Sequence, residues 1–258
     1  MSIRDLLYTD FDGTAVDDPD DVILDALDDP RYRQRIAPLT AILQDASNTP
    51  YDRFLACCAL TSWAEPAGYR AVAEATKAGD KTVWYRELID RRFSVDETFS
   101  QLAGAVRISG DFATDNSTEQ ERATALVALI GVADQFYFDW QLAAAIDNST
   151  AGSARDEIAA TVRRGIAALT QGKPPAFDLG AQLAELARSM TTVDEQLAVQ
   201  LGYELARVDS SPSTLIRLTP IASQGMSPES RSFGTYLATI GDEQVQAAIS
   251  QLREDRIE

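Results

Sequence analysis

Two carboxylates near the N-terminus are the residues of this chain whose types and spacing most plainly suit chemistry. Asp10 and Asp12 stand one residue apart within residues 6–16, LLYTDFDGTAV. The chain contains no histidine, which removes the commonest general base and the commonest metal ligand. Triads that need histidine and Cys/His zinc sites are therefore excluded. If the chain is an enzyme, its chemistry rests on carboxylates, Arg, Lys or hydroxyl groups.

The string LLYTDFDGTAV resembles the first signature of haloacid-dehalogenase-type phosphatases, an apolar strand followed by Asp-x-Asp-Gly-Thr. The resemblance implies that Asp10 attacks phosphorus as the nucleophile. It also implies that Asp12 protonates the leaving group and later activates water. A carboxylate can form an aspartyl-phosphate, and Mg²⁺ would screen the charges.

The companion features of that family do not follow along the chain. Its fold alternates parallel strands with helices, and we find at most one strand-like segment, near residues 5–11. The three lysines, Lys77, Lys81 and Lys173, adjoin no strand-like segment, and no later strand ends in paired acids. We therefore interpret the motif as a polar turn stabilised by an aspartate, with Gly13 at positive φ.

The chain is strongly acidic, and the acid is concentrated at one end. The formal net charge is −17, and residues 1–29 hold ten aspartates with one basic residue, Arg4. Such a surface repels nucleic acids and anionic membranes and attracts basic proteins. We expect Asp17, Asp18, Asp20 and Asp21 to contact such a partner. The aspartates do not have EF-hand spacing, so we expect neither a metal nor a cofactor.

Aromatic residues near helix ends are a second set of candidates for partner binding. Trp84 and Tyr137 have mostly polar helical neighbours, and aromatic side chains are common anchors at interfaces. The only cysteines, Cys57 and Cys58, are adjacent in a helical segment, where a disulfide between them would be strained. We expect them to be small buried apolar residues.

The elements that must position these residues are helices. Apolar residues recur at helical spacing from Pro30 to the C-terminus, and convincing alternating strands are absent. We expect an all-α fold of about a dozen helices, including one over residues 81–93. Residues 110–117 and 147–152 are expected to be polar loops. We divide the chain into an acidic N-terminal segment, residues 1–29, and a helical repeat domain, residues 30–258.

Two segments align when shifted by 69 residues: 52–69, DRFLACCALTSWAEPAGY, and 121–138, ERATALVALIGVADQFYF. Arg53 corresponds to Arg122 in this alignment. With Asp45, paired leucines and small residues around it, this pattern resembles HEAT-like α-helical repeat proteins. The resemblance covers about a third of the chain and implies stacked antiparallel helix pairs, an α-solenoid. An irregular helical array is the alternative.

These observations favour a non-catalytic scaffold that binds a basic protein. A bacterial immunity-type protein that neutralises a basic toxin is one example that fits the charge and the lack of catalytic groups. The alternative is a Mg²⁺-dependent phosphatase that uses Asp10 and Asp12, and a helical enzyme acting through other carboxylates remains open. The N-terminus lacks the pattern of a signal peptide, and no stretch of 18 apolar residues occurs. We therefore expect a cytoplasmic protein, whose oligomeric state the sequence leaves open.

Overall fold

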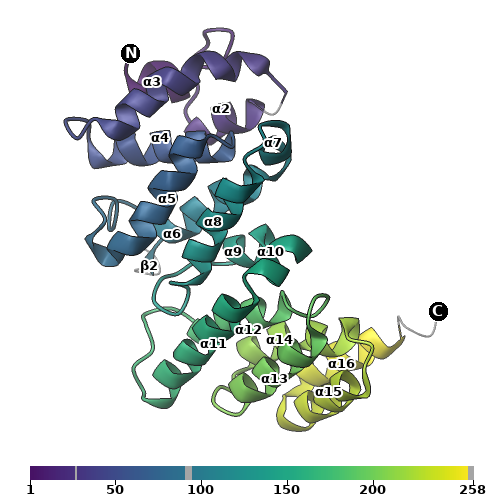
Figure 1. Cartoon of the computed structure of the whole chain (residues 1–258). Coiled ribbons are helices and arrows are strands. Elements are labelled where there is room, and N and C mark those ends of the chain that lie inside the picture. The colour runs from purple at the N-terminus through teal and green to yellow at the C-terminus, as the bar shows by residue number, and fades with distance from the viewer. Residues whose placement is uncertain (27, 91–94, 255–258) are drawn as a thin grey trace. The chain divides into compact units, whose positions relative to one another are not determined.

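The fold is nearly all helical, as the sequence predicts. The computed structural model describes residues 1–26, 28–90 and 95–254. Over these residues it contains sixteen α-helices, two short 3₁₀-helices and one antiparallel pair of two-residue strands (Figure 1). Five of the α-helices, α1, α2, α7, α9 and α10, have five to seven residues. These short helices account for most of the excess over the expected dozen.

The chain divides into two compact units, residues 1–129 and 130–258. In the first unit, α4 packs against α3, α5 and α6 and is buried nearly all round. The elements of this unit are α1 (Ile3–Leu7), α2 (Pro19–Asp25), η1 (Pro30–Tyr32), α3 (Arg33–Gln44), α4 (Pro50–Ser62), α5 (Pro66–Ala78), η2 (Gly79–Lys81), β1 (Ile89–Asp90), β2 (Val95–Asp96), α6 (Thr98–Ile108), α7 (Gly110–Asp115) and α8 (Glu119–Ile130), whose last residue lies beyond the boundary.

In the second unit, α12 and α14 are the central pair. α12 packs against α11, α13 and α14, and α14 also packs against α15 and α16. The elements are α9 (Gln141–Ala145), α10 (Asn148–Ser153), α11 (Arg155–Thr170), α12 (Leu179–Arg188), α13 (Glu195–Ala206), α14 (Pro212–Gln224), α15 (Pro228–Ile240) and α16 (Glu243–Glu254).

The strand-like segment expected near residues 5–11 is not a strand. Residues 3–7 form α1, because the Ser2 side chain accepts a hydrogen bond from the Asp5 backbone and the Asp5 carboxylate accepts one from the backbone of Ser2. This capping box starts a helix. Ile3, Leu6 and Leu7, spaced by three and one residues, are all buried. Residues 1–29 do not stand apart, because α1 contacts α3 and α4, and α2 contacts α4.

The helix expected over residues 81–93 is also absent from its described part. Residues 82–88 form turns, and Arg86 has a φ of 75°. The carboxylate of Asp96 accepts the Arg86 N–H at 2.5 Å and so holds this turn. The run of β-branched and aromatic residues before it, 82–85, has low helix propensity, and residues 91–93 lie outside the described residues.

Two segments expected to be polar loops contain short helices. Residues 110–115 form α7, and residues 148–153 form α10, whose N-cap Asp147 accepts the Thr150 N–H at 2.7 Å. Short polar residues compete for backbone hydrogen bonds and favour either a turn or a cap. Their presence alone does not separate a loop from a one-turn or two-turn helix.

The segments that align at a shift of 69 residues share two contacts. Arg53 Nε donates to the Leu43 carbonyl near the end of α3 at 3.0 Å, and Arg122 Nε donates to the Val106 carbonyl near the end of α6 at 3.2 Å. Further along, the Ala64 carbonyl accepts from the Thr118 hydroxyl, and the corresponding Ala133 carbonyl accepts from the Gln182 amide. Arg53 and Arg122 correspond at this shift, as do Ala64 and Ala133, whereas the residues that they contact lie at other offsets. In each segment a side chain satisfies a backbone carbonyl near a helix end.

Candidate functional site

The Asp10–Thr14 segment is a tight turn that the Asp10 carboxylate stabilises. Asp10 Oδ1 accepts the backbone N–H groups of Asp12 at 2.9 Å and Thr14 at 2.7 Å. Gly13 has a φ of 90°, and Thr9 forms an antiparallel bridge with Ala15. The hydrogen bond from the Thr14 backbone, more than any other contact, lowers the pKa of Asp10. The turn that the sequence predicts is therefore present, and an acceptor oxygen of the candidate nucleophile is occupied.

Two arginines that the sequence analysis did not single out hold this turn against the body of the unit. Arg31 lies 2.9 Å from Asp12 and 2.6 Å from Asp29, and its guanidinium also donates to the Phe11 carbonyl. Arg35, on α3, donates to three carbonyls of residues 6–10 and lies 4.3 Å from the centre of the Phe11 ring. The hydrogen bond from Arg31 is the largest cause of the lowered pKa of Asp29.

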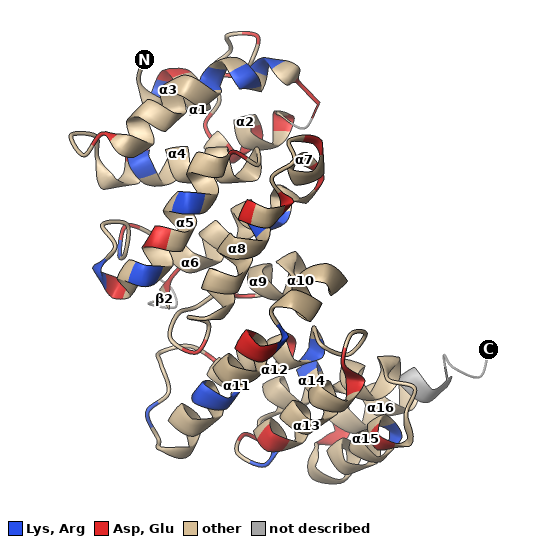
Figure 2. Cartoon of the chain, in the orientation of Figure 1, with Lys and Arg blue, Asp and Glu red and all other residues tan. Residues whose placement is uncertain are grey.

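The four aspartates expected to contact a partner surround the first turn of α2, and all are exposed. Asp18 is the N-cap of this helix and accepts the Asp20 backbone N–H at 3.0 Å. Desolvation first, and then the charges of Asp18 and Asp21, raise the pKa of Asp20. We refer to Asp17, Asp18, Asp20 and Asp21 as the acidic patch. Figure 2 shows acidic residues on α2 and basic residues at the start of α3.

The two aromatic candidates lie in different units, and neither adjoins the acidic patch in sequence. Trp84 is 5% exposed, packs edge-on against Phe54 and lines a cavity of about 540 Å³ in the first unit. Tyr137 belongs to the second unit, where its ring centre lies 5.9 Å from that of Phe177. Trp84 is therefore part of a cavity wall rather than a projecting anchor.

A smaller cavity of about 180 Å³ in the second unit includes Tyr137 in its lining. Its other notable lining residues are a second aromatic, three carboxylates and an arginine: Trp140, Asp139, Asp178, Glu185 and Arg217. Arg217 Nε lies 3.6 Å from Glu185. Aromatic faces next to carboxylates are the surroundings that a cationic side chain prefers.

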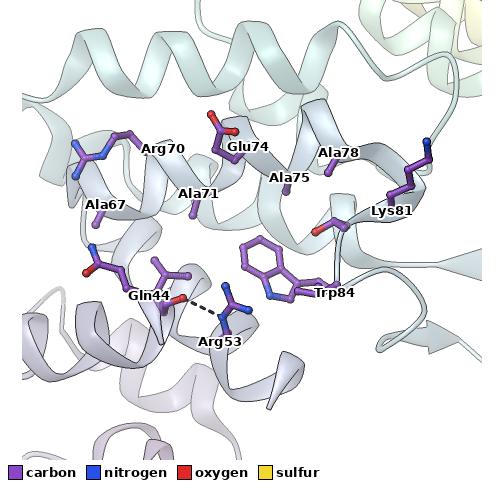
Figure 3. Close-up of a pocket in the computed structure, with 13 residues that line it drawn as sticks. Gln44, Arg53, Ala67, Arg70, Ala71, Glu74, Ala75, Ala78, Lys81 and Trp84 are labelled. Carbon is purple, nitrogen blue, oxygen red and sulfur yellow. Dashed lines mark hydrogen bonds between the residues drawn. The ribbon is translucent and has the colours of Figure 1, made fainter. Parts of the chain in front are cut away.

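The larger cavity in the first unit has the opposite character. Arg53, Arg70 and Lys81 line it together with one carboxylate, Glu74. Figure 3 shows Arg70 and Lys81 at its two ends, with the alanines of α5 between them and Arg53 beside the indole of Trp84. No motif marks this cavity, because its residues come from the end of α3, the start of α4, one face along the length of α5 and the turns that follow α5. The alanine spacing on α5 was the one available signal.

The cysteines are unbonded, and burial dominates their chemistry. Cys57 is buried, and desolvation raises the pKa of its thiol to about 12. The pKa of Cys58 is also raised well above its ordinary value by desolvation. A thiolate is the nucleophilic form of cysteine, so neither residue is poised for thiol chemistry near neutral pH.

Within the described residues, no group of three or more acidic or cysteine side chains is arranged to hold a metal ion. None of the helices built from those residues combines the length and the apolar character needed to cross a bilayer. Over residues 1–26, 28–90 and 95–254, the one sheet is an antiparallel pair of two-residue strands, and the parallel sheet that the phosphatase resemblance implies is absent. Comparison of the chain with protein-family models, with curated proteins and with solved structures finds no match.

Proposed function

We propose that this chain is a non-catalytic helical scaffold that binds a basic protein, and that the acidic patch is the main contact. The observation that carries the proposal is the concentration of charge: ten of the 40 acidic residues fall within residues 1–29, against one arginine. Four of these carboxylates lie exposed around one helical turn, and the pKa of Asp20 is raised in part by its neighbours. A cationic partner would relieve this repulsion and be attracted at long range.

The cavity around Tyr137 supports the same class of partner. Its three carboxylates outnumber its one arginine, which already pairs with Glu185. A lysine or arginine side chain could place its charge among Asp139 and Asp178 and its stem against the aromatic rings. The acidic patch and this cavity thus favour the same cationic chemistry, one in each unit.

Three finer statements belong to the proposal. The helices form HEAT-like pairs, which the matching contacts of Arg53 and Arg122 support. The chain acts in the cytoplasm. It binds no nucleic acid, because its net charge of −17 repels phosphate. An immunity-type protein that blocks a basic toxin is one protein class with these properties, an analogy of size and charge rather than of fold.

The phosphatase alternative has less support from the geometry. One oxygen of Asp10 accepts two backbone hydrogen bonds, and Arg31 pairs with Asp12. Phosphatase assays with and without Mg²⁺, on the wild type and Asp10→Asn, test it directly. Turnover that needs both Mg²⁺ and Asp10 would overturn the scaffold proposal.

The binding proposal is tested by affinity capture from the native host at low and high salt. The variant replaces the acidic patch, Asp17→Asn, Asp18→Asn, Asp20→Asn and Asp21→Asn. The control removes the same charge from exposed carboxylates elsewhere: Asp80→Asn, Asp156→Asn, Glu229→Gln and Glu243→Gln. We expect a basic protein whose retention falls with salt and with the patch variant but not with the control. Retention that is independent of salt, or equally reduced by both variants, contradicts the proposal.

A further inference from the structure

The cavity beside α5 has a basic lining, although the chain as a whole is acidic. The protein carries a net charge of −17, yet three of the four ionisable groups that line this cavity are cations. The single carboxylate, Glu74, is paired at 2.7 Å with Lys77, which does not line the cavity. Among the described residues, Arg53, Arg70 and Lys81 form no ion pair, and Arg53 uses only its Nε to hold the Leu43 carbonyl.

The wall of the cavity also contains a buried donor without an acceptor. Trp84 is 5% exposed, and its Nε1 has no hydrogen-bond partner within the described part of the chain. Buried polar groups are nearly always hydrogen-bonded, and an exception calls for an explanation. The indole N–H can only donate. Figure 3 shows the ring on the same wall as the guanidinium of Arg53. This wall therefore offers the indole N–H, which has no acceptor, and the guanidinium nitrogens that do not hold the Leu43 carbonyl.

Most of the remaining lining is apolar, and Gln44 and Thr82 are its uncharged polar residues. Ala67, Ala71, Ala75 and Ala78 lie along one side of α5, with the indole ring of Trp84 on the facing wall. Leu43 also lines the cavity. Residues four apart share a face of a helix, and alanine leaves the space next to that face open. The volume of about 540 Å³ lies within the range of about 300–1,000 Å³ found for small-molecule sites.

We infer that this cavity binds a small organic anion, a molecule that joins a flat apolar body to a single acidic group. The apolar body lies between the alanine face of α5 and the indole, and the acidic group pairs with Arg53 and with Arg70 or Lys81. This site is separate from the acidic patch, because none of the four patch aspartates lines the cavity and because its charge selects anions rather than cations. It therefore does not depend on the proposed protein partner.

Two probes with the same ring and opposite charge test the inference on the intact chain. Naphthalene-1-sulfonate carries the anion, and 1-naphthylmethylammonium carries a cation. The chain has three tryptophans, so a ¹⁵N-labelled sample gives three indole N–H signals, and Trp84→Phe identifies the one from Trp84. We expect the sulfonate to shift that signal in a saturable titration and the ammonium probe to leave it in place.

Two substitutions separate a built site from adventitious binding of an aromatic probe. Arg70→Gln with Lys81→Gln, both at exposed positions, should weaken the sulfonate about tenfold by removing charge-assisted contacts. Lys173→Gln, an exposed lysine outside the lining, should leave binding unchanged. Equal binding of the two naphthalene probes, or an unchanged affinity in the double variant, would overturn the inference. Binding of an acidic peptide in place of the sulfonate would also overturn it.

Discussion

The carboxylate of Asp10 accepts two backbone hydrogen bonds, whereas that of Asp12 forms an exposed ion pair. Exposed ion pairs contribute little to stability, and a carboxylate that caps a turn contributes more. We expect Asp10→Ala to lower the midpoint of urea unfolding clearly and Asp12→Ala to change it little. An equal loss in both variants would contradict the structural role given to Asp10.

The same prediction has a pH dependence with a definite sign. The pKa of Asp10 is lowered in the folded state, so its contribution to stability is present above the ordinary pKa of an aspartate. It is lost as pH falls through the lowered folded-state pKa. The difference between wild type and Asp10→Ala should therefore shrink below about pH 4, which urea titrations at several pH values can measure.

Gly68 lies where α5 packs tightly against the backbone of α4. A Cβ at this position would lie 2.5 Å from the Thr61 backbone nitrogen, a contact that backbone movement alone can relieve. We expect Gly68→Ala to lower the free energy of unfolding by about 1–3 kcal/mol, the usual cost of overpacking. Gly152→Ala is the matched control, because a Cβ at that position would lie 3.6 Å from Val193 Cγ1, an ordinary van der Waals contact, and the substitution should be neutral. Denaturant unfolding of both variants measures the contrast.

Glu195 joins the start of α13 to the start of α15. One carboxylate oxygen accepts from the Ser227 backbone and from the hydroxyls of Ser227 and Ser230. Desolvation opposes the ionised form, but the hydrogen bonds from these serines prevail and lower the pKa of Glu195 to about 2. This ionised carboxylate therefore stabilises the packing of two helices that are far apart in sequence.

We expect Glu195→Gln to lower the free energy of unfolding by about 1.5 kcal/mol at pH 7, because charged acceptors form the stronger hydrogen bonds. Since the folded-state pKa is depressed, the contribution is complete above pH 4.5 and is lost as pH falls toward 2. Urea unfolding of the wild type and Glu195→Gln between pH 7 and pH 2 measures the difference in their free energies of unfolding. A difference that stays constant over that range would mean that the ionised carboxylate is not the cause.

Periodicity predicted the long helices well, because burial of an apolar face is a local pattern repeated over many residues. It failed where one side-chain contact decides the backbone. Asp96 holds the turn at Arg86, and a capping box converts residues 3–7 into a helix. The contact between Asp96 and Arg86 joins residues that the sequence separates, so their proximity is known only after folding, and the helix over residues 81–93 was wrong. The capping box of Ser2 and Asp5 is a local spacing that the hydrophobic pattern does not register, and the strand near residues 5–11 was wrong for that reason.

Prediction of the candidate site has the same limit. The motif at Asp10 and the acidic run were visible because each is contiguous in the sequence. The cavity with Arg53 and Trp84 was not visible, because four separate segments form it. Trp84 was selected as a candidate anchor because its helical neighbours are mostly polar, and in the structure it is part of a buried wall. Whether any of these residues meets a partner stays a prediction.

Across the protein as a whole, negative charge is most concentrated at the acidic patch, where neighbouring carboxylates repel one another when no partner is bound. The acidic patch supplies four of the ten aspartates in residues 1–29, and Arg31 and Arg35 are committed to the neighbouring turn. These two arginines therefore do not form ion pairs with the carboxylates of the acidic patch. A cationic partner that binds the acidic patch would reduce the repulsion between its carboxylates, and this reduction would contribute to the binding free energy.

Asp20 provides the measurement that connects this repulsion to the proposed function. Its pKa is raised in the folded state, so its ionisation disfavours folding once pH exceeds that pKa, and the effect vanishes when pH is well below the ordinary value of an aspartate. Asp20→Asn should therefore raise the melting temperature at pH 7, with a gain that decreases in high salt and disappears at low pH. If the acidic patch binds a basic protein, the same substitution should weaken that binding. If Asp20→Asn raises the melting temperature but binds the partner as well as the wild type does, Asp20 does not contact the partner.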